Sequence, residues 1–143
     1  QDLILRPTTI PAAADVRVLE LDITAGATQQ HLSRWSYPAF VALRDALARW
    51  PQATYVLWYP IKRRSALMPF YRKAGNLSAK SALLCELLVR PDDSPLRMNG
   101  SGLLILNAPW QFDRRLQASV AALRGVLGEA GASSRVEWLR EAA

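Results

Sequence analysis

The stretch SALLCELLVRPDDSPLRMNGSGLLIL, residues 81–106, contains two apolar runs separated by a polar segment. The runs at residues 81–89 and 102–106 have the length and composition of buried strands. Residues 91–95 between them, Pro-Asp-Asp-Ser-Pro, are of the types that favour turns. Two buried strands that follow one another with no helix between them predict an antiparallel hairpin.

Helical spacing occurs on both sides of this hairpin. Apolar residues recur at intervals of three or four after Pro38, which suits a first turn, and Pro51 ends that pattern. Asp113 suits the cap of a later helix, in which Leu116 and Val120 begin an apolar stripe. The helices predicted in this way are residues 29–35, 38–50, 65–74 and 113–127.

The remaining apolar segments are short and suit strands. Residues 55–59 form a continuous apolar and aromatic run, which is typical of a strand covered on both faces in a parallel sheet. Residues 136–138 alternate as an edge strand does, and residues 2–5 and 16–23 are the other candidate strands. Strands and helices that alternate along the chain predict an α/β layered fold, with a mostly parallel sheet and the hairpin at one edge.

Length and composition indicate a single domain, residues 1–143, with a basic surface. The chain has 143 residues, and 50% of them are hydrophobic, as in ordinary globular domains. Eighteen Lys and Arg against twelve Asp and Glu give a net charge of +6, and all but three of the cations are Arg. Arg binds phosphate as a planar fork and stacks on bases, so this bias suits a nucleic-acid partner. A GC-rich genome that encodes Arg freely is the alternative explanation.

The same composition excludes several kinds of site. One Cys and one His rule out a disulfide framework, a Cys-rich zinc site and a multi-His metal site. No apolar run is long enough for a transmembrane helix, so no membrane partner is expected. These counts predict a metal-free protein of the reducing cytoplasm. Cys85 is expected to be a small core hydrophobe and Glu86 a paired, buried carboxylate.

The segment WYPIKRR, residues 58–64, carries side chains suited to RNA. Aromatic residues at the end of a strand precede three cations, a combination that stacks bases and binds phosphates. The predicted RNA-binding residues are Trp58, Tyr59, Lys62, Arg63 and Arg64. The alternative is a solvated loop beside a buried aromatic strand.

The segment NAPW, residues 107–110, directly follows a buried strand, where ligands gather in open α/β sheets. The segment resembles the motif of Asn or Asp, two prolines and an aromatic residue in amino-methyltransferases, with Ala108 in place of the first proline. In that motif the amide oxygen and a backbone carbonyl accept hydrogen bonds from the exocyclic amine, and the aromatic ring stacks on the flipped base. Asn107, Pro109 and Trp110 are therefore candidate catalytic residues. The alternative is a strand-ending turn with a core tryptophan.

A third segment suits a cofactor. Asp22 and Gly26 lie in a loop of small residues between a predicted strand and a predicted helix, a setting that can hold a nucleotide or S-adenosylmethionine. Both are candidate cofactor-binding residues, and an ordinary turn is the alternative.

Several motifs from residue 37 onward carry a family resemblance. They are YPA at 37–39, RWP at 49–51, YVLWYPIK at 55–62, CEL at 85–87, GSGLLILNAPW at 100–110 and VEWL at 136–139. In this order and spacing, residues 37–143 resemble the C-terminal half of the RlmJ family. These are bacterial S-adenosylmethionine-dependent 23S ribosomal RNA adenine-N6 methyltransferases, also known as competence or DNA-utilisation proteins.

The resemblance implies a partial Rossmann-like sheet of the class I methyltransferase type, S-adenosylmethionine as cofactor and ribosomal RNA as partner. Residues 1–36 depart from the family pattern. Its catalytic Asp-Pro-Pro-Tyr has a nearest counterpart with Arg6 in place of Asp, and Asp22 and Gly26 echo its cofactor loop out of order. The resemblance therefore predicts a truncated or degenerate methyltransferase. The alternatives are a non-catalytic basic RNA-binding module and an inert remnant whose strand at 55–59 has an uncovered edge.

Overall fold

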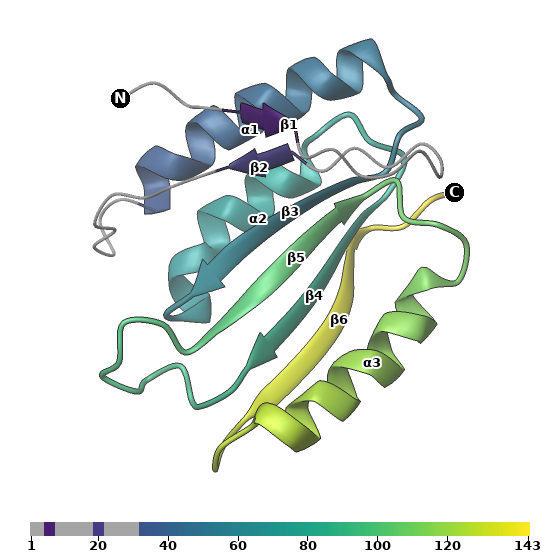
Figure 1. Ribbon diagram of the computed structural model, residues 1–143. Helices are drawn as coiled ribbons and strands as arrows, with labels where there is room; N and C mark the ends of the chain where they lie inside the picture. Colours follow the sequence, from purple (N-terminus) through teal and green to yellow (C-terminus); the bar gives the residue numbers. More distant parts are fainter. Residues whose placement is uncertain (1–4, 8–18, 22–31) are drawn as a thin grey trace. The chain divides into compact units, whose positions relative to one another are not determined.

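The computed structural model describes residues 5–7, 19–21 and 32–143 (Figure 1). The chain divides into two compact units, Gln1–Ala53 and Thr54–Ala143. Along the chain the described elements follow the order strand, strand, helix, strand, helix, strand, strand, helix, strand, with one short 3-10 turn added before the second helix. This order agrees with the prediction, except that the helices predicted at 29–35 and 38–50 form one helix in the described part.

The first unit contains two short strands and one helix. β1 (Leu5–Pro7) pairs antiparallel with β2 (Leu19–Leu21). α1 (Leu32–Arg49) is a single helix of 18 residues, so the short helix predicted at 29–35 and the one predicted from Pro38 are continuous in the described part. Pro38 therefore lies inside α1, and the prediction that it occupies the first turn is wrong.

The second unit is built on a four-stranded sheet. Its strands are β3 (Tyr55–Ile61), β4 (Ala82–Leu88), β5 (Gly100–Leu106) and β6 (Ser133–Arg140), in the spatial order β3-β5-β4-β6. Every neighbouring pair is antiparallel, so the predicted mostly parallel sheet is wrong for the described strands. The hairpin of β4 and β5 is confirmed, but it occupies the centre of the sheet rather than an edge.

The position of β5 explains this difference. β5 is antiparallel to both β3 and β4, so these two strands run parallel to each other without being neighbours. After β4 the chain turns back as β5, which lies between β3 and β4. The pairing of β5 with β3 is long-range, and no local sequence pattern indicates it. β6 lies at the far edge beside β4, which confirms the predicted edge strand.

The two faces of the sheet carry different helices. α3 (Phe112–Leu127) packs on the face that presents Leu83, Cys85 and Ile105, so Cys85 is the core hydrophobe that was predicted. α3 begins one residue before Asp113, and Gln111 rather than Asp113 is its N-cap. The opposite face carries η2 (Arg64–Leu67) and α2 (Met68–Gly75), with Pro69 in the first turn of α2 (Figure 1).

α3 lies over β4 and β6 and leaves β3 less covered. On the α3 face of β3, Val56 and Trp58 are 55% and 54% exposed. The prediction that residues 55–59 are covered on both faces is therefore wrong for these two side chains. None of the described helices is long and apolar enough to cross a membrane.

Candidate functional site

The two segments predicted to contact RNA lie at opposite ends of the sheet. In the pairing of β3 with β5, Tyr55 faces Leu106 and Ile61 faces Gly100. Residues 107–110 therefore follow β5 next to the start of β3, whereas residues 62–64 follow the end of β3. The seven residues of β3 span about 20 Å between the two ends at the usual rise per residue. The structure therefore does not bring the two segments together in one site.

Trp58 and Tyr59 point to opposite faces of the sheet, as adjacent residues of a strand do. Trp58 is 54% exposed on the α3 face, and Tyr59 is 5% exposed on the α2 face. The Tyr59 ring packs against Phe70 of α2, with ring centroids 4.5 Å apart. Of this aromatic pair, only Trp58 is accessible to a ligand.

Tyr59 belongs to a row of residues that crosses the whole sheet. Tyr59 pairs with Gly102, Gly102 with Glu86, and Glu86 with Arg135, so all four positions share the α2 face. A Cβ atom on Gly102 would lie 2.3 Å from Cζ of the Tyr59 ring. The missing side chain at Gly102 thus lets the Tyr59 ring lie across β5 and reach Glu86.

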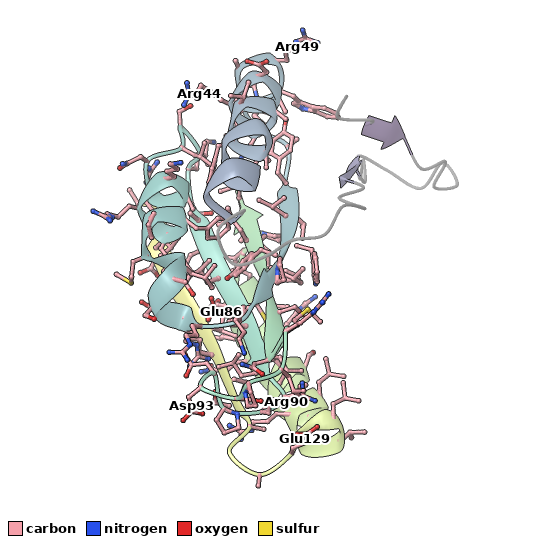
Figure 2. All side chains as sticks on the ribbon, turned by 90° about the vertical axis from the view of Figure 1, so that its left-hand side faces the viewer. Arg44, Arg49, Glu86, Arg90, Asp93 and Glu129 are labelled. Carbon is pink, nitrogen blue, oxygen red and sulfur yellow. The ribbon has the colours of Figure 1, made fainter. Side chains whose placement is uncertain are left out.

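Glu86 is the centre of this row and is 0% exposed (Figure 2). Its Oε1 accepts hydrogen bonds from the hydroxyls of Tyr59, at 2.7 Å, and Tyr71. Its Oε2 accepts from Nε of Arg135 at 2.7 Å and from Nε of Arg64 at 3.2 Å. Both carboxylate oxygens are therefore occupied by protein donors, which confirms the prediction that Glu86 is paired.

The charge states around Glu86 follow from these contacts. Burial alone would raise the pKa of Glu86, but the hydrogen bonds from Arg135, Tyr71 and Tyr59 outweigh it and lower that pKa. Burial, together with the Glu86 carboxylate, raises the pKa of Tyr59 and of Tyr71 well above the usual value for a phenol. Both tyrosines are therefore neutral donors to a charged acceptor, and no proton here is placed for transfer to a substrate.

Sequence reasoning did not identify the partners of Glu86. Tyr71 lies 15 residues before it and Arg135 lies 49 residues after it. The Arg135 guanidinium also stands 5.2 Å from the centroid of the Tyr71 ring. The signal that was available is Glu86 itself, because a carboxylate in a buried strand requires cationic or hydroxyl partners.

The Lys62 side chain is hydrogen-bonded to the loop that joins β4 to β5. Its Nζ donates to the carbonyl oxygens of Ser94 and Leu96. Nδ2 of the buried Asn99 donates to the carbonyl oxygen of Lys62 at 2.9 Å and to that of Asp92 at 3.2 Å. These bonds fold the loop back over the end of β3, and Asn99 is a residue that sequence reasoning missed.

Arg64 is also a structural residue, whereas Arg63 is open to solvent. The backbone N–H of Arg64 donates to Oδ2 of Asp92 at 3.0 Å, in addition to the bond from its side chain to Glu86. Arg63 immediately before it is exposed. Of the five predicted RNA-binding residues, Trp58 and Arg63 are therefore the accessible ones.

The far side of the same loop is closed by an ion pair. Arg90 donates from Nη2 to Oε1 of Glu129 at 2.7 Å and from Nη1 to the carbonyl oxygen of Met98 at 3.0 Å (Figure 2). The backbone N–H of Glu129 donates to the carbonyl oxygen of Val89 at 2.7 Å. The end of α3 is thus fastened to the end of β4.

Asn107 ties three strand ends together at the opposite end of the sheet. Its Oδ1 accepts a hydrogen bond from the backbone N–H of Lys80 at 2.8 Å. Its carbonyl oxygen accepts a hydrogen bond from the Thr54 hydroxyl, Oγ1, at 2.8 Å. Its own N–H donates to the carbonyl oxygen of Ser81 at 3.0 Å. The amide oxygen that was predicted to hold a substrate amine already has a donor, while Trp110 is 86% exposed.

The polar side chains at the carboxyl end of β3 are engaged within the chain, with one exception. Nζ of Lys62 and Nδ2 of Asn99 donate to backbone carbonyl oxygens, and Oδ2 of Asp92 accepts the N–H of Arg64, whereas Oδ1 of Asn99 is buried without a hydrogen-bond partner. Asp22 and Gly26, the predicted cofactor residues, lie outside the described part of the chain. Within that part, no three His, Cys, Asp or Glu side chains cluster as metal ligands would.

The fold of the second unit is that of a mixed α/β domain with an antiparallel sheet. A similar fold occurs in the crystal structure of a protein from Legionella pneumophila, with a TM-score of 0.60 and 24% sequence identity. That similarity covers 77% of this chain and 39% of the other.

Sequence comparison identifies the family. The model of the family described as ribosomal RNA large subunit methyltransferase D, RlmJ, matches residues 35–140, so the chain belongs to this family. It is 28% identical over 99 residues to the ribosomal RNA large subunit methyltransferase J of Haemophilus influenzae, covering 68% of this chain and 35% of that protein. It is 27% identical over 105 residues to the Escherichia coli protein of the same name, covering 72% and 38%. The chain thus spans little more than a third of each relative.

Proposed function

We propose that the chain is an RNA-binding part of an S-adenosylmethionine-dependent methyltransferase that acts on N6 of an adenine in 23S ribosomal RNA. The observation that carries this proposal is the family match over residues 35–140. The net charge of +6 supports it, because cations that neutralise phosphates provide most of the affinity of such proteins for nucleic acid.

The geometry supports a role for this chain in binding rather than in chemistry. Glu86 is the buried carboxylate of the second unit, and protein donors occupy both of its oxygens. Trp58 lies in the middle of β3 and Arg63 two residues beyond its carboxyl end, and both side chains are exposed. An exposed indole and a guanidinium suit the stacking of a base and the binding of a phosphate.

Binding of unmodified 23S ribosomal RNA, followed by fluorescence anisotropy over a range of salt concentrations, tests this proposal. Affinity should fall steeply as salt rises, because phosphate contacts release counterions. Arg63→Glu should weaken binding and reduce the salt slope by about one. Arg124→Glu, the same change at an exposed arginine of α3, is the matched control and should have less effect. Salt-independent binding, or equal effects of the two variants, would contradict the proposal.

The second candidate is a non-catalytic basic RNA-binding module, and the occupation of both Glu86 oxygens by protein donors favours it. Calorimetric titration with S-adenosylmethionine and a methyl-transfer assay on unmodified 23S RNA separate the two candidates. Cofactor binding with methyl transfer supports the enzyme. RNA binding without either supports the module.

A further inference from the structure

Trp110 is the most exposed large apolar side chain of the described residues, at 86%. An indole offers more apolar area than almost any other side chain, so leaving it in water forgoes a large gain in stability. Such residues are enriched where proteins bind partners. The exposure of Trp110 is therefore not explained by the role of this turn in ending β5.

The backbone on both sides of Trp110 is in an unfavourable conformation. Asn107 has φ of 54° and Gln111 has φ of 55°, and these are the non-glycine residues with positive φ in the part of the chain that is described. Asn tolerates this left-handed region, but Gln has no special preference for it. Such strain persists where the surrounding structure enforces it and where function uses it.

The surrounding structure holds this turn firmly. The N–H of Ala108 donates to Oγ of Ser81 at 3.1 Å, and the N–H of Phe112 donates to the carbonyl oxygen of Pro109 at 3.1 Å. Phe112 and Ala108 both pack against the core between α3 and the sheet. The residues beside Trp110 are therefore anchored inward, and the indole between them is held outward.

Three cations are linked to the turn that carries this indole, through a hydrogen bond or along the chain. Lys80, whose N–H binds Asn107, has an exposed side chain, and Arg114 and Arg115 are exposed in the first turns of α3. Asp113 is the acidic residue of that turn and is half-buried. A nucleic acid presents both an aromatic face and regularly spaced negative charges. A base on the indole with phosphates at the cations satisfies both kinds of group.

We propose that Trp110 is a stacking platform for an unpaired base of single-stranded RNA, with Lys80 and Arg114 binding the adjacent phosphates. This inference rests on the proposed function and adds a second RNA contact, at the opposite end of the sheet from Arg63. Unpaired bases are the ones that offer a face to an aromatic side chain, so a single strand is favoured over a duplex. Asn107 then serves as the residue that positions the turn.

The test is anisotropy with a labelled single-stranded RNA 12-mer and with the matching duplex, at fixed low salt. Trp110→Ala should weaken single-strand binding about 5- to 100-fold, while Trp110→Phe should retain most of the affinity, because a phenyl ring still stacks. The Ala variant should keep the salt slope, since it removes no charge. Lys80→Gln and Arg114→Gln should each reduce that slope by about 0.7.

The controls separate this inference from the proposed function. If the unmodified chain binds no RNA, the proposed function fails and this inference fails with it. If the unmodified chain binds RNA and Trp110→Ala binds it equally well, only the platform is overturned. A self-association seen in sedimentation and abolished by Trp110→Ala would also overturn it, because the indole would then be a protein contact. Melting curves of both Trp110 variants establish that they are folded.

Discussion

Glu86 and Trp110 differ in burial, and each has the degree of burial that is usual for the other residue type. Glu86 is charged and 0% exposed, whereas Trp110 is aromatic and 86% exposed. Charged residues are almost never fully buried unless they are paired, and large aromatics are mostly covered. Both positions cost stability relative to the ordinary arrangement, so each needs a compensating interaction.

The compensation is found in different places. Donors from β3, η2, α2 and β6 meet at Glu86, so the folded chain itself supplies every partner. At Trp110 the hydrogen bonds of the turn fix the backbone and leave the indole open. The comparison teaches that the buried charge of Glu86 joins elements of the fold, whereas the exposed indole of Trp110 has no such role and is the one that we propose binds a partner.

Glu86→Gln should produce the largest loss of stability. It leaves the guanidinium groups of Arg64 and Arg135 without their shared carboxylate, at side-chain exposures of 29% and 30%. The free energy of unfolding should fall by about 3 kcal/mol, the lower end for a broken buried ion pair, because both arginines are partly hydrated. Urea denaturation measures this loss. Glu137→Gln, which also loses a bond to Arg135 but at an exposed carboxylate, should cost less than about 1 kcal/mol.

The pH dependence sharpens this prediction. The folded state lowers the pKa of Glu86, so its contribution is fully present above the unfolded pKa and is lost as pH falls through the folded pKa. The difference in stability between the unmodified chain and Glu86→Gln should therefore be constant from neutral pH down to about 5 and shrink below about 4. A difference that grows on acidification would mean that Glu86 is protonated in the folded protein.

Gly102→Ala should have an intermediate effect. The added Cβ would lie 2.3 Å from the Tyr59 ring, which must then move away from Glu86. We expect a loss of about 1–3 kcal/mol, as for overpacking in a core. Gly125→Ala is the matched control, because nothing lies within 4 Å of its added Cβ. It lies in α3 and should stabilise the chain by about 0.5–1 kcal/mol through helix propensity. Equal effects of the two changes would contradict the role given to Gly102.

The order of the elements could be predicted from the sequence, but their directions in the sheet could not. Proline, glycine and apolar spacing are local signals, and they mark β4, β5 and α3 nearly where they occur. The insertion of β5 between β3 and β4 is a pairing across some 45 residues, which depends on how whole surfaces pack. The same limit applies to Val56 and Trp58, since an apolar run does not tell which of its faces a helix will cover.

The candidate sites show a similar division. Glu86 could be predicted to be paired, because a carboxylate in an apolar strand is anomalous by itself. Lys62 and Arg63 are adjacent cations with no local difference, yet the loop carbonyls bind only Lys62 in the described structure. Asn107 and Trp110 could be singled out as a motif. Which of them is engaged and which is free for a ligand depends on the three strand ends that meet there.

Trp110→Ala should have the smallest effect on stability and so completes the comparison with Glu86. An indole that is 86% exposed contributes little buried area, so the free energy of unfolding should change by no more than about 0.5 kcal/mol. Urea denaturation of the chain without RNA measures this. A loss of 2 kcal/mol or more would place the indole among groups that stabilise the fold. In that case Trp110 would resemble Glu86, and its exposure would no longer indicate a binding partner.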